Sequence, residues 1–367
     1  MSELRRFFKN TEVHIGKDFQ AETPFYFDSL RNAFSHYFST YQDQKEIIHL
    51  IIDSANWDQE KFSSARLHHN ISHAILAFHR FFELYIKEVL RSVNPYLAVK
   101  FLEREEELFL FLDQKLPPEQ IKTVEFAESM KRLKYAFKYF DNSTETYRKV
   151  LNPVSFLNDK EAVDSLEMLA EWRNRIMHNG ATYPGFFAFE YLITQRLISL
   201  VVKIIDSKDH KDKFIPHYFV TPSGFDLVRS LQAIRFHYKD FANEEKKKDL
   251  RSIFFYIAHL KEMGRSNLTQ DFYRIKNKDY RELQYDNPIG RTERFAEAEK
   301  NHPEFHQLNK CNCCKAKSQV VYRKHFKDFF TQQQDFVSWL RCFNCDYSIN
   351  ERIGDPYSFG LADHLVF

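Results

Sequence analysis

Residues 69–91, HNISHAILAFHRFFELYIKEVLR, carry apolar side chains at steps of four and three. The repeating positions are Ile71, Ile75, Phe78, Phe82, Ile86 and Val89. This spacing places the six side chains on one face of an α-helix, and such a face is normally buried. The stretch therefore predicts the first helix of a bundle.

Further helices are predicted on both sides of this one. The patterns place them at residues 28–54, about 97–113, about 118–141, 160–178 and about 186–206. Prolines and Asn-Pro or Asn-Gly pairs separate them, because these residues stop helices or form turns. Four main helices between residues 68 and 206 predict an antiparallel bundle. Only 8 of the 367 residues are Gly, whereas 38 are Phe, so a turn-rich all-β fold is disfavoured and a mainly α fold is expected.

The N-terminal sequence MSELRRFFKN has no apolar signal core, and the apolar run 197–205 is short and interrupted by Ser199 and Lys203. We therefore expect a cytoplasmic protein with no membrane partner. Residues 211–328 carry 24 Lys and Arg against 16 Asp and Glu. This local excess of positive charge permits a polyanionic partner such as RNA.

All five cysteines fall near the C-terminus, in the pattern Cys311-x2-Cys314 and Cys342-x2-Cys345 with Cys313 as a surplus thiol. Two such pairs supply the four thiolates of a tetrahedral zinc site. Since four thiolates leave no open position, we expect a structural Zn²⁺. Cys313 is an alternative ligand in the first pair, and four thiols without a metal are the other alternative.

The segment between the cysteine pairs predicts two short strands, at Val320–Tyr322 and Phe336–Leu340. The pairs and strands together resemble a zinc ribbon. Residues 310–328 carry six Lys and Arg against one Asp. This charge suits either an acidic partner or a solvated surface, and the sequence leaves both open.

A second motif, Arg173-Asn174-Arg175-Ile176-Met177-His178, ends the helix predicted at 160–178. Arg173 falls on the apolar stripe formed by Val163, Leu166, Ala170 and Met177, so its charge needs an anionic partner. Glu83 is the candidate. His178 lies about 140° around the helix from Arg173. The two side chains can share a face only if the helix ends or bends between them, and Asn179-Gly180 offers that ending.

Arg173, Asn174 and His178 resemble the R-x4-6-H motif of HEPN-domain ribonucleases, which carry a polar residue directly after the Arg. Glu83 with Lys87 is similar to the acidic and basic pair of that family's first helix, and the resemblance covers roughly residues 66–206. It implies RNA cleavage that needs no metal, by attack of a ribose 2′-hydroxyl on the adjacent phosphate. His178 would move the proton, Arg173 would stabilise the phosphorane, and Asn174 would orient the phosphate or the histidine.

The resemblance also implies a composite site in a homodimer, RNA as substrate and a place in prokaryotic anti-phage defence, as an abortive-infection factor or toxin with an antitoxin or sensor partner. The alternative for this motif is structural: Arg173 and Glu83 form a buried pair, and His178 caps the helix. Two other functions stay open, a non-catalytic RNA- or protein-binding module and a zinc-ribbon regulator that binds duplex DNA.

Two further groups of residues bear on the motif. Arg31-Asn32-x3-His36 has the same spacing, but no bundle precedes it and no stop follows it, so we interpret it as a packed or solvated helix face. His68, His69, His73 and His79 crowd the helix 69–91. His69 and His73 could bind a metal from one face, yet no nearby carboxylate or Cys completes the set. A polar helix face is the interpretation, with contact to RNA as the alternative.

The predicted organisation is thus a helical extension at 1–65, a HEPN-like four-helix bundle at 66–207, a helical charge-rich region at 208–305 and a zinc-ribbon module at 306–367.

Overall fold

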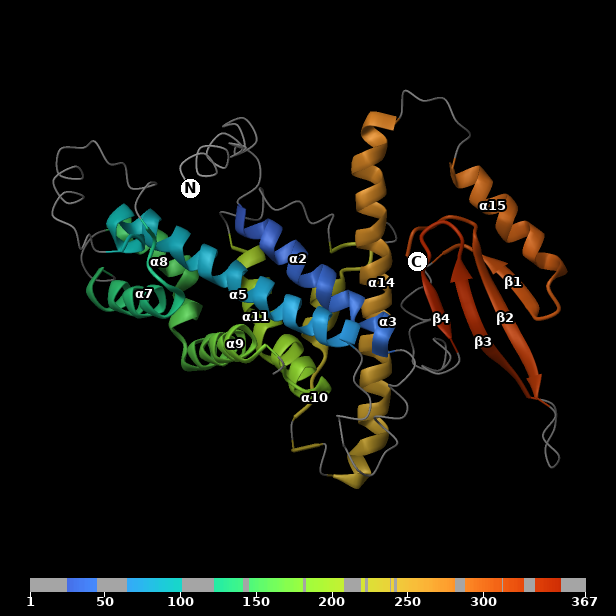
Figure 1. The fold of residues 1–367 in the computed structure, drawn as a ribbon, viewed down its shortest axis with the longest axis horizontal. Helices are drawn as coiled ribbons and strands as arrows, with labels where there is room; N and C mark the ends of the chain where they lie inside the picture. Colours follow the sequence, from blue (N-terminus) through green and yellow to red (C-terminus); the bar gives the residue numbers. More distant parts are fainter. Residues whose placement is uncertain are drawn as a thin grey trace, which may run out of the picture.

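The computed structural model describes residues 25–44, 65–100, 122–140, 145–180, 183–207, 219–221, 224–237, 239–240, 243–280, 288–311, 313–326 and 334–350. Helices make up most of this part, and four antiparallel strands form a small sheet near the C-terminus (Figure 1). The prediction of a mainly α fold with a small β module is confirmed.

The elements are α2 (Phe25–Ser39), α3 (Tyr41–Gln44), α5 (Ala65–Val93), η3 (Pro95–Ala98), α7 (Phe126–Phe140), α8 (Glu145–Leu151), η5 (Asn152–Asn158), α9 (Lys160–Asn179), α10 (Phe186–Glu190), the π-helical η6 (Tyr191–Leu197), α11 (Ile198–Ile205), α13 (Leu227–Ala233), η9 (Glu244–Lys246), α14 (Lys247–Tyr280), α15 (Pro288–Ala298), η10 (Glu299–Asn301), β1 (Phe305–Asn309), β2 (Gln319–Phe326), β3 (Gln334–Cys342) and β4 (Ser348–Asn350).

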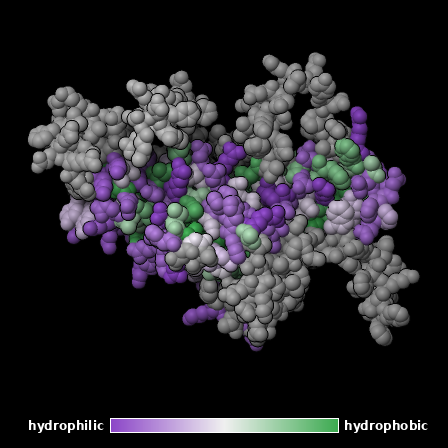
Figure 2. Space-filling view, in the orientation of Figure 1, coloured by the Kyte–Doolittle hydropathy of each residue, from purple (hydrophilic) through white to green (hydrophobic). Residues whose placement is uncertain are grey.

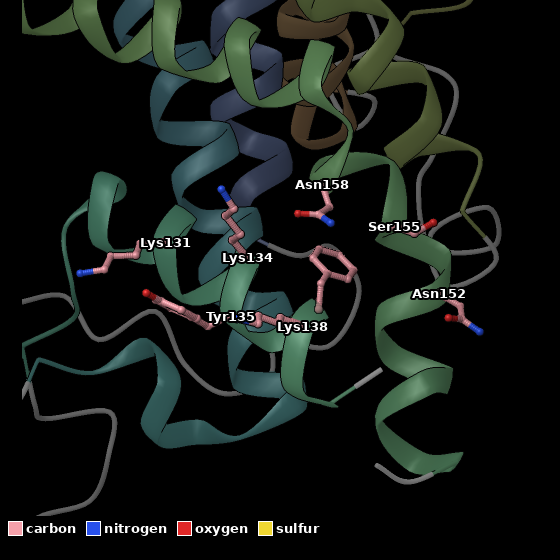
Figure 3. Close-up of a pocket in the computed structure, with 8 residues that line it drawn as sticks. Lys131, Lys134, Tyr135, Lys138, Asn152, Ser155 and Asn158 are labelled. Atoms are coloured by element: carbon pink, nitrogen blue, oxygen red, sulfur yellow. The ribbon is translucent and has the colours of Figure 1, made fainter. Parts of the chain in front are cut away.

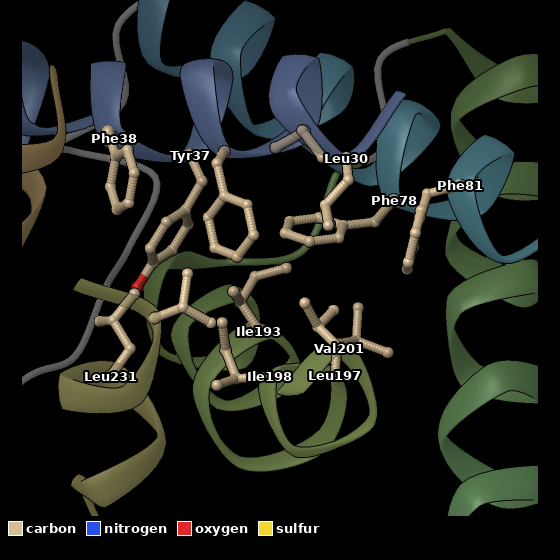
Figure 4. Close-up of a cluster of buried hydrophobic side chains, with 14 of the residues drawn as sticks. Leu30, Tyr37, Phe38, Phe78, Phe81, Ile193, Leu197, Ile198, Val201 and Leu231 are labelled. Carbon is tan, nitrogen blue, oxygen red and sulfur yellow. The ribbon is translucent and has the colours of Figure 1, made fainter. Parts of the chain in front are cut away.

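Helix α5 is the centre of the helical part. It packs against α2, α7, α8 and α9, and the six apolar positions of its predicted stripe are all buried. Figure 4 shows Phe78 and Phe81 of α5 together with Leu30, Tyr37 and Phe38 of α2, opposite the apolar side chains of η6 and α11. Burial of these large side chains contributes about 1.5–3 kcal/mol each. The boundary predicted at residue 65 separates α2 from α5. In the structure these two helices pack together in one core.

A buried ion pair lies beside the aromatic core. Lys261 of α14 pairs with Glu190 at the end of α10, and both side chains are fully buried. Tyr37 of α2 donates to Glu190 Oε2 at 2.9 Å, and Lys261 Nζ donates to Thr40 Oγ1 at 2.9 Å. Because every member has a partner, the network ties α2, α10 and α14 together without leaving an uncompensated charge.

The sheet has the order β1-β2-β3-β4, so each strand pairs with the next one along the chain. Helix α14 stands between the helical bundle and the sheet, and α15 covers the sheet on its far side (Figure 1). Ala296 of α15 packs on Val320 and Tyr322, whose ring stacks on Trp339 at a centroid distance of 3.8 Å. The two predicted strands are confirmed as β2 and β3, and the structure adds β1 and β4 at the edges.

The predicted helices compare well with the observed ones. The helix at 160–178 is α9, and the helix at 186–206 is α10, η6 and α11 with a π-helical turn in the middle. Of the helix predicted at about 97–113, residues 101–113 lie outside the described residues, and residues 95–98 form a 3₁₀ turn. Within the described residues, no helix is both long and apolar enough to cross a membrane. Polar side chains dominate the described part of the face in Figure 2.

Candidate functional site

The clearest candidate site is the cysteine cluster at the end of the sheet where β2 begins and β3 ends. Cys311 and Cys314 lie between β1 and β2, Cys342 is the last residue of β3, and Cys345 lies between β3 and β4. The four Sγ atoms all lie within 4.8 Å of one another. The pairs Cys311–Cys345 and Cys314–Cys342 have Sγ atoms 3.6 Å apart. A zinc ion with Zn–S bonds of about 2.3 Å holds its sulfurs about 3.8 Å apart, so the cluster fits a tetrahedral metal.

The two halves of the cluster have the same backbone geometry. Lys315 N donates to Cys311 O, and Asp346 N donates to Cys342 O, both at 2.9 Å. The residue after the second cysteine adopts a left-handed conformation in each half, with φ 64° at Lys315 and 58° at Asp346. This turn brings the two thiols of each pair to one point, which is how paired cysteines bind one ion.

Polar groups next to the sulfurs complete the metal site. Asn344 Nδ2 donates to Cys314 Sγ at 3.3 Å, and Ser318 Oγ lies 3.2 Å from Cys342 Sγ. Donors of this kind stabilise thiolates and orient them toward a metal. Without a metal, hydrogen bonding to Cys314 and the other thiols, together with burial, raises the pKa of Cys311. A bound cation would reverse that shift by stabilising the thiolates.

Cys313 is not one of the four clustered ligands, although its backbone N–H donates to Cys311 Sγ at 3.3 Å. Its buried thiol lies 3.6 Å from the backbone carbonyl of Met263 in α14, to which it can donate. The four predicted ligands therefore form the possible metal-binding site, and the alternative in which Cys313 replaces one of them is not favoured by this geometry.

The second candidate site is the Arg173 motif on α9. Gly180 ends the helix as predicted, with φ 60° and its N–H donating to Ile176 O at 3.1 Å. The helix continues through Asn179, however, so it does not end between Arg173 and His178. The two residues stay about 140° apart on one continuous helix. The predicted apolar stripe is also rotated, because Met177 is 56% exposed while Ile176 is buried.

Asn174 links the two sides of this motif. Arg173 is half-buried, and its Nη1 donates to Asn174 Oδ1 at 2.9 Å. Asn174 and His178 are both exposed and lie one turn apart, so they share a face of α9. The Arg173 guanidinium thus turns toward the face that carries His178, although the two residues are not neighbours on the helix.

Glu83 does not pair with Arg173. Its Oε1 accepts from Lys87 Nζ at 2.6 Å, because Lys87 lies one turn along the same helix, and its Oε2 lies 3.7 Å from His79 Nδ1. Among the described residues, Arg173 has no carboxylate within 4 Å. The expected Glu83–Arg173 ion pair is therefore replaced by a pair within α5.

Arg173 still lies close enough to Glu83, Lys87 and His79 to affect the pKa of His79. The pKa of His79 is lowered to about 4, mainly by burial; Glu83 opposes the shift, and the positive charges of Arg173 and Lys87 add to it. The His79 ring packs on Phe126 at the start of α7 with centroids 4.5 Å apart. His79 is consequently a neutral, packed side chain at neutral pH, and not a group exposed to a substrate.

The remaining histidines of α5 divide between two neighbours. His68 stacks on Tyr183, just after α9, with ring centroids 3.7 Å apart. His69 and His73 instead face α2, where they meet His36. The motif Arg31–His36, interpreted as a packed or solvated face, thus contributes its histidine to a cluster that sequence spacing alone does not reveal.

A third candidate site is a basic cavity of about 570 Å³ between α7 and η5. Figure 3 shows Lys131, Lys134, Tyr135 and Lys138 on the α7 side, with Asn152, Ser155 and Asn158 on the η5 side. The rings of Tyr135 and Tyr139 stack 6.0 Å apart and are 48% and 60% exposed. Exposed aromatic rings beside lysines are the features that bind single-stranded nucleic acid.

Sequence reasoning missed the α7 cavity. Lys131, Lys134 and Lys138 recur at steps of three and four, and Tyr135 and Tyr139 are four apart. This spacing is the signal that could have identified a basic aromatic helix face. Comparisons of the chain with known protein families, with characterised proteins and with solved structures gave no match.

Proposed function

We propose that this protein is a cytoplasmic endoribonuclease of the HEPN type, which cleaves RNA without a catalytic metal and carries a structural zinc at Cys311, Cys314, Cys342 and Cys345. The observation that carries the proposal is the row of side chains Arg173, Asn174 and His178 on α9. Arg173 holds a positive charge with no carboxylate partner among the described residues, and Asn174 directs it toward the exposed face of His178.

Each side chain of the row has a role in the proposed reaction. The ribose O2′ attacks phosphorus as the P–O5′ bond breaks, which leaves a 2′,3′-cyclic phosphate and a 5′-hydroxyl. Arg173 would stabilise the charge on the phosphorane oxygens. His178 would take the proton from the 2′-hydroxyl or give one to the departing 5′-oxygen. Asn174 would keep the guanidinium oriented.

The reaction needs both a proton acceptor and a proton donor, but α9 of one chain offers a single exposed histidine. Two α9 helices facing each other in a homodimer would supply two His178 side chains to one phosphate. Met177 supports this arrangement, because an exposed apolar side chain beside the row suits an interface between copies.

The zinc proposed at the cysteine cluster would stabilise the sheet and would not take part in the chemistry, since four thiolates leave no position for water or substrate. Reduced cysteines capable of binding zinc are expected in the cytoplasm.

The test is cleavage of a defined single-stranded RNA by the purified full-length protein, with excess EDTA added at the start of the reaction. Cleavage should persist, and the products should carry 2′,3′-cyclic phosphates. Arg173→Ala and His178→Ala should each reduce the rate by about 100-fold or more. Arg175→Ala is the matched control, because Arg175 lies two residues after Arg173, is exposed and is ion-paired with Glu171. Equal loss in all three variants would refute the assigned roles.

A second candidate function is RNA binding without cleavage. The observation that favours it is the α7 surface, where Tyr135 and Tyr139 stack beside three lysines. Intact RNA that is nevertheless retained by the wild-type protein, with retention unaffected by His178→Ala, would support this candidate over the nuclease.

A further inference from the structure

Three histidines from two helices converge at one place on the surface. His69 and His73 lie one turn apart on α5, with ring centroids 4.1 Å apart. His36 of α2 lies 5.0 Å from the His73 ring and 6.1 Å from the His69 ring. Helices α2 and α5 pack along each other. The three rings are therefore held together by rigid elements and not by loops.

The spacing of the rings suits a metal ion. Zn–N bonds are about 2.0–2.1 Å, so three imidazoles around a tetrahedral zinc have ring centres about 5 Å apart. The observed distances of 4.1, 5.0 and 6.1 Å bracket that value. His69 and His73 are exposed and make no hydrogen bond within the described part of the chain. Their rings can turn to present the required nitrogens.

A neighbouring hydrogen-bond chain sets which nitrogen of His36 is available. Asp43 has only 4% of its side chain exposed, and it accepts from Arg66 Nε at 2.5 Å and from Asn70 Nδ2 at 3.3 Å. Because the amide nitrogen of Asn70 donates to Asp43, its Oδ1 must face His36 Nδ1, 3.4 Å away. Nδ1 of His36 is then the donor, and the lone pair of the neutral ring lies on Nε2.

Hydrogen bonds of this kind are typical of metal-binding histidines, whose second ring N–H usually donates to a fixed acceptor. We propose that His36, His69 and His73 form a second metal site, separate from the cysteine cluster, for a divalent transition-metal ion such as Zn²⁺. Within the described part of the chain, the ligands are three imidazoles and no carboxylate. The ion then keeps its full charge and one open position, which water or an anionic ligand can occupy.

The test is zinc stoichiometry and affinity of the full-length protein, measured by equilibrium dialysis against buffered Zn²⁺. The wild type should bind one more zinc than the variants His69→Asn and His73→Asn, both of which change exposed side chains. His36→Asn should weaken this zinc at least tenfold. His306→Asn is the control, since His306 is exposed on β1.

Two results would overturn the proposal. Equal stoichiometry in wild type and His73→Asn would mean that no zinc binds there. Unchanged affinity in a folded His36→Asn variant would mean that His69 and His73 chelate alone, as any pair four residues apart on a helix can. Circular dichroism of each variant distinguishes a lost ligand from a lost fold.

Discussion

The ring of Phe38 in α2 lies directly against the backbone of Gly264 in α14, so that a Cβ built on Gly264 would be 2.4 Å from Phe38 Cδ2. Phe38 is fully buried and cannot move aside cheaply. Glycine at this position is therefore explained by the close approach of two helices and not by a turn.

We expect Gly264→Ala to lower the free energy of unfolding by about 1–3 kcal/mol, because the methyl group overpacks the contact with Phe38. Helix propensity alone predicts the opposite sign, a gain of about 1 kcal/mol. Urea denaturation decides between them. In a Phe38→Leu background, Gly264→Ala should lower the free energy of unfolding by less. An increase in stability on Gly264→Ala in the wild-type background would contradict the contact with Phe38.

Substitution of Cys313 and substitution of Cys342 should have opposite effects on the zinc content of the protein. Cys342→Ser removes a ligand and should release about one equivalent of zinc, whereas Cys313→Ser should retain it, since the Cys313 thiol faces the Met263 carbonyl. Mass spectrometry of the metal content of freshly purified protein makes the measurement. Zinc loss in Cys313→Ser, or no zinc in the wild type, would show that the ligand set is wrong.

The pH dependence of stability should carry a contribution from His79. Its pKa falls from 6.5 in the unfolded chain to about 4 in the folded one, with burial as the main cause. Between these values the unfolded chain binds a proton that the folded chain does not, so stability falls as the pH is lowered from about 6.5 toward 4. The loss at pH 5 relative to pH 7.5 is about 2 kcal/mol.

His79→Gln should remove this part of the dependence, measured as the difference in unfolding free energy between the two pH values. His237→Gln, which changes an exposed histidine, is the control. Identical pH dependence in wild type and His79→Gln would show that the side chain titrates alike in the folded and unfolded chain.

The α7 surface should contribute to RNA affinity. Tyr135→Ala and Tyr139→Ala are each expected to weaken binding of single-stranded RNA by about 1–3 kcal/mol, the range for loss of one base-stacking ring. Lys134→Ala should reduce the slope of affinity against salt concentration by about 0.7. Fluorescence anisotropy measures both. Tyr96→Ala is the control, because Tyr96 is 55% exposed on η3, and a similar loss there would indicate a nonspecific effect.

The sequence predicted the features that depend on residues a few positions apart in the chain. The stripe of α5 follows from its own spacing, and the cysteine pairs follow from theirs, since both depend on residues a few positions apart. Helix α14 is different. Residues 257–264 are all buried, among them Lys261 and Glu262. A helix surrounded by protein has no polar face, so its periodicity does not show which side meets the core.

The sites divide in the same way. The Glu83–Arg173 expectation failed because Lys87, one turn away on the same helix, is the nearer partner for Glu83. The meeting of His36 with His69 depends on how α2 packs on α5, which no spacing within either segment encodes. Edge strand β4 is only three residues long, and the five residues of β1 do not alternate, since their apolar side chains, Phe305 and Leu308, are three positions apart.

The second cysteine knuckle also joins the sheet to α14. Ser266 Oγ donates to Cys345 O at 2.8 Å, Arg265 Nη2 donates to Asp346 O at 2.7 Å, and Ser348 N donates to Glu262 Oε1 at 2.8 Å. The free energy of metal binding is therefore not confined to the β module. By thermodynamic linkage, an ion at the cysteines would raise the unfolding temperature of the helical bundle as well, making the two halves of the molecule one cooperative unit.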